Sequence, residues 1–215
     1  NNQRKHDSSA FFLLINKLSD IIQLDLSNLK ISDKSTALRA GYKTRIFRNV
    51  RIPMKIIIVR HGDPNYEIDS LTPTGFREAA LLVPYLTKLN VKDFYVSPLG
   101  RAKDTAEPTL KALNRTATTC EWLREFSPKI QRPDQPNACN IIWDWLPNDW
   151  TTEPLYYNVD TWADTDTMKK SHVKEEYDWV CNNLDALLEE HGYVREKHYY
   201  RVEKANSDTL VFFCH

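Results

Sequence analysis

Apolar residues along this chain fall into short continuous runs and into longer stretches with helical spacing, and both become regular from Met54 onward. The run "MKIIIVR" (54–60) is rich in β-branched residues and predicts a strand buried on both faces of a sheet. "DFYVS" (93–97) predicts a second, shorter strand, and "DTLVFFC" (208–214) predicts another buried strand. These runs are the predicted centre of the fold.

The segments that follow the first two strands predict helices. Thr72 is placed as an N-cap and Pro73 as a first-turn residue, and apolar residues then recur at helical spacing. A second helix is predicted over residues 99–113. Pro84 and Pro108 lie inside these helices, where a proline removes a backbone donor, so we expect a bend at Pro84 and a break or kink at Pro108.

The stretch "HVKEEYDWVCNNLDALLEEHG" (172–192) has the clearest helical pattern in the chain, and Gly192 is placed to end it. The order of the predicted elements is strand, helix, strand, helix, and then helix and strand. Such alternation is typical of an α/β protein with parallel strands. We therefore predict a three-layer α/β/α fold with a mostly parallel sheet and helices on both faces.

Composition and charge separate the first quarter of the chain from the rest. With 41% hydrophobic and 11% aromatic residues, 215 residues suffice for one sizeable core. Residues 1–53 contain ten Lys and Arg against four Asp, whereas residues 54–215 contain 19 Lys and Arg against 25 Asp and Glu. We predict that residues 1–53 are an N-terminal extension outside the domain and that residues 54–215 form the domain.

The overall charge balance narrows the range of partners. Lys and Arg equal Asp and Glu at 29 each, so no basic surplus exists to hold a nucleic acid or an anionic membrane, and we expect neither as a partner. The cysteines show no C-x-x-C spacing and the remaining histidines no ligand pattern, so we predict no metal site. A reducing cytoplasm is the expected location, and the oligomeric state stays open.

Polar side chains of defined chemistry stand at the ends of three predicted strands. Arg60 and His61 end the first strand, Arg101 follows the second, and His215 ends the last. Because the carboxyl ends of parallel strands meet at one edge of a sheet, we expect these side chains to converge. Guanidinium groups bind the oxygens of a phosphoryl group, and an imidazole nitrogen can attack its phosphorus.

The motifs "VRHG", "SPLGRAKDTA", "WLREF" and the strand running into a late histidine together resemble the histidine phosphatase superfamily, also called phosphoglycerate-mutase-like. The resemblance covers residues 54–215. It implies that His61 is the nucleophile that becomes phosphorylated and that Glu125 is the proton donor. It also implies that Arg60, Arg101 and His215 hold the phosphoryl oxygens, with no cofactor required.

The resemblance leaves open which residue is the proton donor and which makes a further contact with the phosphate, and it also bears on the C-terminus. Glu121 lies four residues before Glu125 and competes with it for the role of proton donor. Asp63, Asn65 and Glu67 compete for a further contact with the substrate phosphate, and of these we favour Asn65. Members of the superfamily continue past the second histidine, so the resemblance implies that the domain is incomplete at its C-terminus.

The predicted function is hydrolysis of a small-molecule phosphate monoester through a phosphohistidine. Mutases of the superfamily carry a segment like "LNERHYG" after the third strand, and "WLREFSPKI" lacks it, so we favour a phosphatase. The alternatives are a cofactor-dependent phosphomutase of the phosphoglycerate mutase type and a phosphate-binding pseudoenzyme. The aromatic segment 141–162 is predicted to pack over the sheet edge, to form a lid on the substrate, or to do both.

Overall fold

A computed structural model describes residues 53–132, 139–142, 147–151 and 153–215 of the chain. The predicted N-terminal extension, apart from its last residue, lies outside the described residues. In the described part, no helix is long and apolar enough to cross a membrane.

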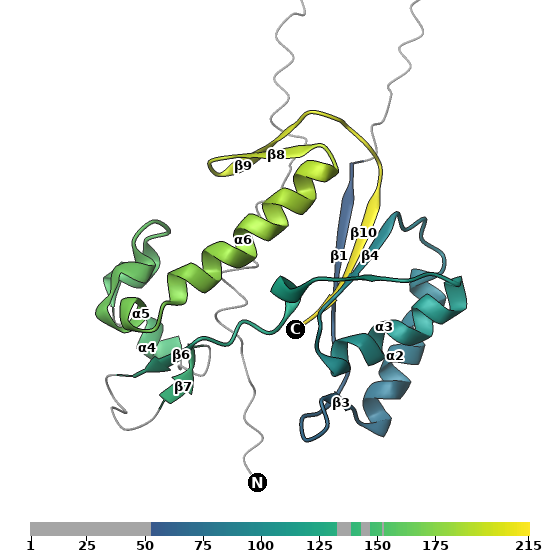
Figure 1. Cartoon of the computed structure of the whole chain (residues 1–215), viewed down its shortest axis with the longest axis horizontal. Helices are drawn as coiled ribbons and strands as arrows, with labels where there is room; N and C mark the ends of the chain where they lie inside the picture. Colours follow the sequence, from purple (N-terminus) through teal and green to yellow (C-terminus); the bar gives the residue numbers. More distant parts are fainter. Residues whose placement is uncertain (1–52, 133–138, 143–146, 152) are drawn as a thin grey trace, which may run out of the picture.

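The central sheet is parallel and has the strand order β1-β10-β4-β5. Its strands are β1 (Lys55–Arg60), β4 (Asp93–Val96), β5 (Thr118–Thr119) and β10 (Thr209–Cys214). The strand that comes last in the sequence therefore lies between the first two that the sequence predicts (Figure 1). The three predicted strands and the parallel arrangement are confirmed.

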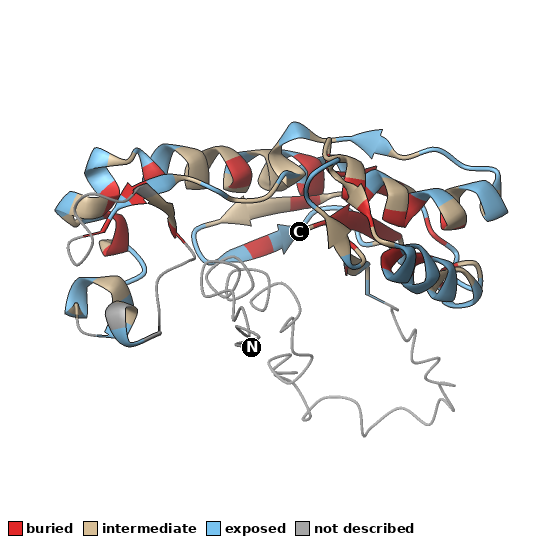
Figure 2. Cartoon of the chain, turned by 90° about the horizontal axis from the view of Figure 1, so that it is seen from below, coloured by how far each residue is buried: buried red, intermediate tan, exposed pale blue. Residues whose placement is uncertain are grey.

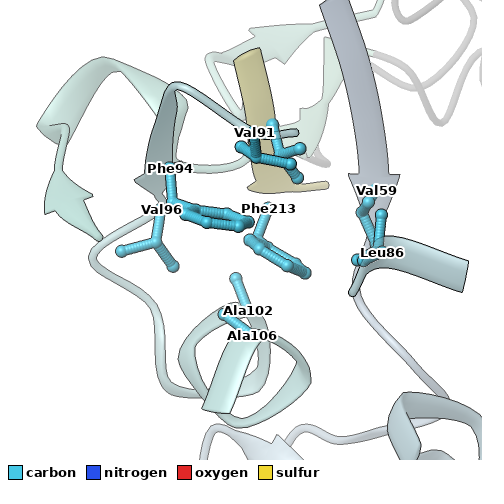
Figure 3. Close-up of a cluster of buried hydrophobic side chains, with 9 residues drawn as sticks. Val59, Leu86, Val91, Phe94, Val96, Ala102, Ala106 and Phe213 are labelled. Atoms are coloured by element: carbon cyan, nitrogen blue, oxygen red, sulfur yellow. The ribbon is translucent and has the colours of Figure 1, made fainter. Parts of the chain in front are cut away.

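Helices cover both faces of this sheet, which confirms the predicted three-layer α/β/α fold. Helices α2 (Pro73–Leu86) and α3 (Gly100–Leu113) lie on one face, and α6 (Val173–Glu190) lies on the other (Figure 1). On the α2 and α3 side, the Phe213 ring stacks against Phe94 at a centroid distance of 6.4 Å and faces the small alanines of α3 (Figure 3).

The strands differ in burial more than their sequences suggest. All six residues of β10 are buried, whereas in β1 only Val59 is buried and Ile56, Ile57 and Ile58 are partly exposed. Within the described residues β1 is an edge strand and β10 is a central one (Figure 2 shows buried residues in red). An apolar β-branched run thus marks a strand of this sheet without showing that both faces are covered.

Helix α2 begins as predicted, since the Thr72 side chain caps it by accepting a hydrogen bond from the Gly75 N–H at 3.2 Å. Pro84 and Pro108 lie inside α2 and α3 without ending either helix. A break at Pro108 is therefore absent. Both helices continue past their prolines because their apolar contacts with the sheet outweigh the loss of one backbone hydrogen bond.

The remaining elements are short. An antiparallel hairpin of β2 (Pro64–Asn65) and β3 (Ser70–Leu71) follows β1 and leads into α2. The others are β6 (Lys129–Gln131) paired with β7 (Cys139–Ile141), β8 (Tyr193–Glu196) paired with β9 (Tyr199–Val202), the helices α4 (Pro147–Thr151) and α5 (Asp166–Lys170), and the 3₁₀ turns Glu121–Leu123, Pro154–Tyr157 and Trp162–Asp164.

The aromatic segment 141–162 contributes to a separate hydrophobic cluster beside the N-terminal half of α6. Trp162 is buried there with its ring 5.2 Å from the Tyr177 ring, and Trp150 and Tyr156 pack against the same cluster. The segment thus packs against α6, which extends beyond the sheet, and not over the sheet edge (Figure 1). Trp143 and Trp145 lie outside the described residues.

Candidate active site

Backbone hydrogen bonds bring the carboxyl ends of β1, β10 and β4 together. The His61 N–H donates to the Cys214 carbonyl at 3.0 Å, and the Ser97 N–H donates to the Phe213 carbonyl at 2.9 Å. The parallel register, with Arg60 opposite Cys214, therefore places both predicted site histidines at the same edge. Their ring centroids are 5.2 Å apart. The expected convergence of the strand ends is confirmed.

The His61 ring is held in one tautomer. Its Nδ1 lies 2.8 Å from the Gly62 carbonyl oxygen, which can only accept, so Nδ1 carries the proton. The Nε2 atom then keeps its lone pair. His61 is only 8% exposed, so its imidazole is largely shielded from water. This is the arrangement that a neutral nitrogen nucleophile needs.

Electrostatics keep this imidazole neutral. Burial is the largest effect and lowers the pKa of His61 below its ordinary value of 6.5. The Gly62 carbonyl opposes that shift, while the positive charges of Arg101 and Arg60 add to it. At neutral pH the His61 Nε2 lone pair is therefore available.

His215 presents a hydrogen-bond donor to the same region. Its Nε2 lies 2.7 Å from the Ser97 hydroxyl oxygen, which also accepts a hydrogen bond from the Leu99 N–H at 3.2 Å. Because the Ser97 hydroxyl already accepts from the Leu99 N–H, we assign its proton to the His215 Nε2, and this assignment places the ring proton of a neutral His215 on Nδ1. That Nδ1 is buried and has no hydrogen-bond partner in the described part of the chain.

The ring of His215 is also held neutral. Burial, followed by the positive charge of Arg101 and the proximity of His61, lowers the pKa of His215 to about 3. His215 is therefore a neutral donor at any pH at which the protein is expected to work.

Arg101 lies at the start of α3, is only 6% exposed, and makes two ion pairs. Its Nη1 donates to Asp69 Oδ1 and its Nη2 donates to Glu125 Oε2, both at 2.7 Å. Its Nε is buried without a hydrogen-bond partner among the described residues. Glu125, not Glu121, is thus the predicted carboxylate that reaches the site, because Glu121 is exposed in the preceding 3₁₀ turn.

Asp69 is a member of this group that the sequence did not indicate. Its other oxygen, Oδ2, accepts a hydrogen bond from the Gly100 N–H at 2.7 Å, so its two oxygens bind successive residues of α3. Partial desolvation opposes ionisation of Asp69, but the hydrogen bonds from Gly100 and Arg101 outweigh it and lower the pKa of this carboxyl. The motif "IDSLT" carries no local pattern that announces this contact.

Thr105 is a second residue that sequence reasoning missed. Its hydroxyl accepts a hydrogen bond from the Gly62 N–H at 3.0 Å and donates to the Arg101 carbonyl at 2.7 Å. Gly62 leaves no room for a side chain, since a Cβ there would lie 2.8 Å from the Gly75 carbonyl oxygen. Helical spacing alone places Thr105 one turn after Arg101, and this spacing is the signal that could have found it.

The other two predicted site residues, Arg60 and Asn65, make no hydrogen bond to the site side chains described above. Arg60 is exposed, and its guanidinium makes no hydrogen bond or ion pair with any described residue, although its charge lowers the pKa of both site histidines. Asn65 uses its side-chain oxygen to accept the Glu67 N–H at 3.1 Å within the β2–β3 connection. Its contact with a substrate phosphate stays a prediction.

This edge of the sheet combines the lone pair of the His61 Nε2 with two buried hydrogen-bond donors that have no partner among the described residues. The donors are the Arg101 Nε and the His215 Nδ1. Buried polar groups are nearly always hydrogen-bonded, so two such donors at one edge of the sheet indicate a site for an anion. Nowhere in the described ranges do three or more His, Cys, Asp or Glu side chains group as metal ligands.

Comparison with known proteins agrees with this geometry. Residues 56–154 match the model of the histidine phosphatase superfamily (branch 1). The matched range contains His61, Arg101, Glu125 and Asp69, whereas His215 lies beyond it. The resemblance stated from the sequence motifs is thereby confirmed.

Individual relatives are more distant. The chain is 32% identical over 84 residues to the 2,3-bisphosphoglycerate-dependent phosphoglycerate mutase of Thermoplasma acidophilum, with 34% of this chain and 42% of that protein covered. It thus spans less than half of the length of this curated relative.

Two solved structures are similar to larger parts of the chain. A phosphoserine phosphatase from Entamoeba histolytica has 18% identity and a TM-score of 0.42, covering 75% of this chain and 74% of the other. A mycobacterial glucosyl-3-phosphoglycerate phosphatase has 18% identity and a TM-score of 0.41, covering 74% and 73%.

Proposed function

We propose that this chain carries the catalytic residues of a phosphatase that hydrolyses a small-molecule phosphate monoester through a phosphohistidine, without a metal ion. One observation carries the proposal. The His61 Nε2 keeps its lone pair because Nδ1 is bound to the Gly62 carbonyl, and it lies in a site with two unpartnered buried donors. A site that only bound phosphate would not need a nucleophile held in one tautomer.

The first step transfers the phosphoryl group to the protein. The His61 Nε2 lone pair forms a bond to phosphorus while the bond between phosphorus and the ester oxygen breaks. Glu125 gives its proton to the departing oxygen, so the product is a neutral alcohol. The Arg101 Nε and the His215 Nδ1 donate to the equatorial oxygens, where negative charge is spread in the transition state.

Glu125 must change partners for this step. In the free protein its carboxylate is paired with Arg101 at 2.7 Å. A bound phosphoryl dianion takes over the Arg101 donors and places negative charge beside Glu125. Glu125, released from Arg101, then takes up from solvent the proton that a general acid gives to the leaving oxygen.

The second step returns the protein to its starting state. A water molecule attacks the phosphorus of the phosphohistidine, and its proton passes to the Glu125 carboxylate that the first step left behind. The bond between phosphorus and Nε2 breaks, inorganic phosphate leaves, and His61 regains its lone pair. Donors that do not move between the steps lower both barriers.

A phosphomutase of the phosphoglycerate mutase type is the second candidate. The Thermoplasma acidophilum relative carries that name, and a mutase uses the same phosphohistidine to return the phosphoryl group to a substrate oxygen. The segment "WLREFSPKI" lacks the mutase-type sequence, which supports the phosphatase. A requirement for 2,3-bisphosphoglycerate and conservation of total ester phosphate would identify the mutase.

The test is turnover by the full-length protein on a panel of phosphate esters, with inorganic phosphate release as the readout. His61→Ala should abolish release and should prevent formation of an acid-labile, base-stable phosphoenzyme. His198→Ala is the matched control, because His198 is exposed between β8 and β9 and should leave both readouts unchanged. Turnover that survives His61→Ala contradicts the mechanism, and absence of turnover on every ester favours a phosphate-binding pseudoenzyme.

A further inference from the structure

The loop between β2 and β3 ends on a carboxylate that binds two successive residues of α3. Asp69 Oδ1 accepts from the Arg101 Nη1 and Oδ2 accepts from the Gly100 N–H, each at 2.7 Å. The first contact restrains the end of the guanidinium and the second restrains the backbone from which it projects. Two such restraints fix the direction of a long side chain better than one does.

The loop itself is held tightly in place. Asp69 has a φ of 47°, in the left-handed region that Asp and Asn tolerate better than most residues. A Cβ at Gly100 would come within 2.0 Å of the Asp69 carbonyl oxygen, so the loop backbone packs directly on the start of α3. One residue later, the Ser70 hydroxyl donates to Asp104 Oδ2 at 2.5 Å. The loop is therefore a rigid support for Asp69.

The two carboxylates on Arg101 are anchored differently. Asp69 is bound by both the guanidinium and a backbone N–H, whereas Glu125 is bound by the guanidinium alone in the described part of the chain. We therefore expect an arriving phosphoryl group to displace Glu125 more easily than Asp69. Arg101 would then keep its Nη1 on Asp69 and direct Nη2 and Nε to the phosphoryl oxygens.

We propose that Asp69 is a positioning residue that aims Arg101 at the bound phosphoryl group, an inference that rests on the proposed function of this site. A role through geometry and a role through charge predict opposite changes in phosphate affinity when Asp69 is replaced. If Asp69 acted only through its negative charge, its removal would strengthen the attraction between Arg101 and phosphate. If it aims the guanidinium, its removal weakens phosphate binding although the site becomes more positive.

The experiment compares three variants of the full-length protein by calorimetric binding of inorganic phosphate at pH 7.5. Asp69→Asn keeps the shape of the side chain and the tolerance of a positive φ, but its amide cannot accept from both Gly100 and Arg101. We expect phosphate affinity to fall about tenfold or more, since loss of one well-aimed charge-assisted hydrogen bond to phosphate costs at least about that factor. Glu125→Gln should instead raise phosphate affinity, because a neutral side chain competes less for Arg101.

Asp104→Asn is the matched control. Among the described residues, Asp104 ties β3 to α3 at the same junction without a hydrogen bond or ion pair to the Arg101 side chain. Its variant should therefore lose thermal stability comparably to Asp69→Asn and bind phosphate like the parent protein. Equal loss of phosphate affinity in both variants would show that Asp69 is only structural. Unchanged or tighter binding by Asp69→Asn would overturn the proposal.

Measuring ester hydrolysis as well as phosphate binding tests the proposed function separately from the role of Asp69. With an active parent protein, Asp69→Asn should lower kcat/KM for p-nitrophenyl phosphate by a factor similar to its loss of phosphate affinity. A parent protein that binds phosphate but hydrolyses no ester contradicts the phosphatase, and the binding measurements still decide whether Asp69 aims Arg101. A parent protein that binds no phosphate contradicts both.

Discussion

At the scale of single residues, the site depends on which partner each ionisable group has. His61 is buried with its Nδ1 bound to a carbonyl, and Arg101 lies between two carboxylates. Both arrangements leave something unused, namely the lone pair of the His61 Nε2 and the N–H of the Arg101 Nε. These unused groups define what the site can bind and attack.

The role of Glu125 is tested by changing the leaving group. An alkyl alcohol needs a proton as it departs, and p-nitrophenolate hardly does, so we expect Glu125→Gln to slow alkyl phosphate hydrolysis by about 10² to 10⁴ and p-nitrophenyl phosphate hydrolysis far less. Glu121→Gln is the control, because Glu121 is exposed. Steady-state rates on both substrates measure the difference, and selective loss in the Glu121 variant would transfer the role to that residue.

The pH dependence of kcat/KM reports on His61. The pKa of this imidazole is lowered from 6.5 by burial, so the neutral nucleophile persists below the pH at which an exposed histidine becomes protonated. Activity should be constant near neutral pH and fall as the pH drops through this lowered pKa. A profile of kcat/KM on p-nitrophenyl phosphate measures the midpoint, and an acidic midpoint above 6.5 contradicts the burial argument.

At the scale of elements, the site lies where two strand ends meet the start of α3. The Thr105 hydroxyl joins the Gly62 backbone, just after β1, to the Arg101 carbonyl in the first turn of α3. The β2–β3 loop packs on that same turn from outside through Asp69. Relative placement of elements, more than any one side chain, therefore sets the distance between nucleophile and guanidinium.

Thr105→Val tests this connection. Valine keeps the shape of the side chain but leaves the Gly62 N–H without its acceptor, so we expect a loss of about 1–3 kcal/mol in the free energy of unfolding. Thr109→Val on the same helix is the control. The Thr109 hydroxyl is fully buried without a hydrogen-bond partner among the described residues, so its removal should be neutral or stabilising. Urea unfolding measures the free energy of unfolding of both variants. Equal values for the two variants would show that the Thr105 hydrogen bond does not stabilise the fold.

At the scale of the whole molecule, the same burial that prepares the histidines links folding to pH. In the folded protein the pKa of His215 is lowered from 6.5 to about 3, so the unfolded chain binds a proton that the folded chain does not. The free energy of unfolding is therefore unaffected by this group above pH 6.5 and falls as the pH decreases from 6.5 toward 3.

His215→Gln should flatten this dependence. A single such group contributes at most about 1.4 kcal/mol per pH unit to the slope, so the parent protein should lose stability between pH 7 and pH 5 more steeply than the variant. Urea unfolding at several pH values gives the slopes. His198→Gln, at an exposed position, should retain the parent slope, and an equal slope in all three proteins would refute the linkage.

Much of this architecture follows from local patterns. The strands at 55–60, 93–96 and 209–214, the capped start of α2 and the extent of α6 agree with the predictions, because periodicity and capping are properties of neighbouring residues. The convergence of His61, Arg101 and His215 was also predicted from the sequence, because the carboxyl ends of parallel strands lie at one edge of a sheet. The continuity of α3 through Pro108 was not predicted, because packing against the sheet opposes the local preference.

The sequence by itself determined the order of the elements, the fold class and the chemistry at the strand ends, because each is encoded by residues close together along the chain. Only the tertiary structure decided that Asp69 and Glu125 both bind Arg101 and that Thr105 binds the Gly62 backbone. These partners are 32, 24 and 43 residues apart. Contacts at such separations depend on how loops pack on helices, and no local pattern of hydrophobic and polar residues specifies that packing.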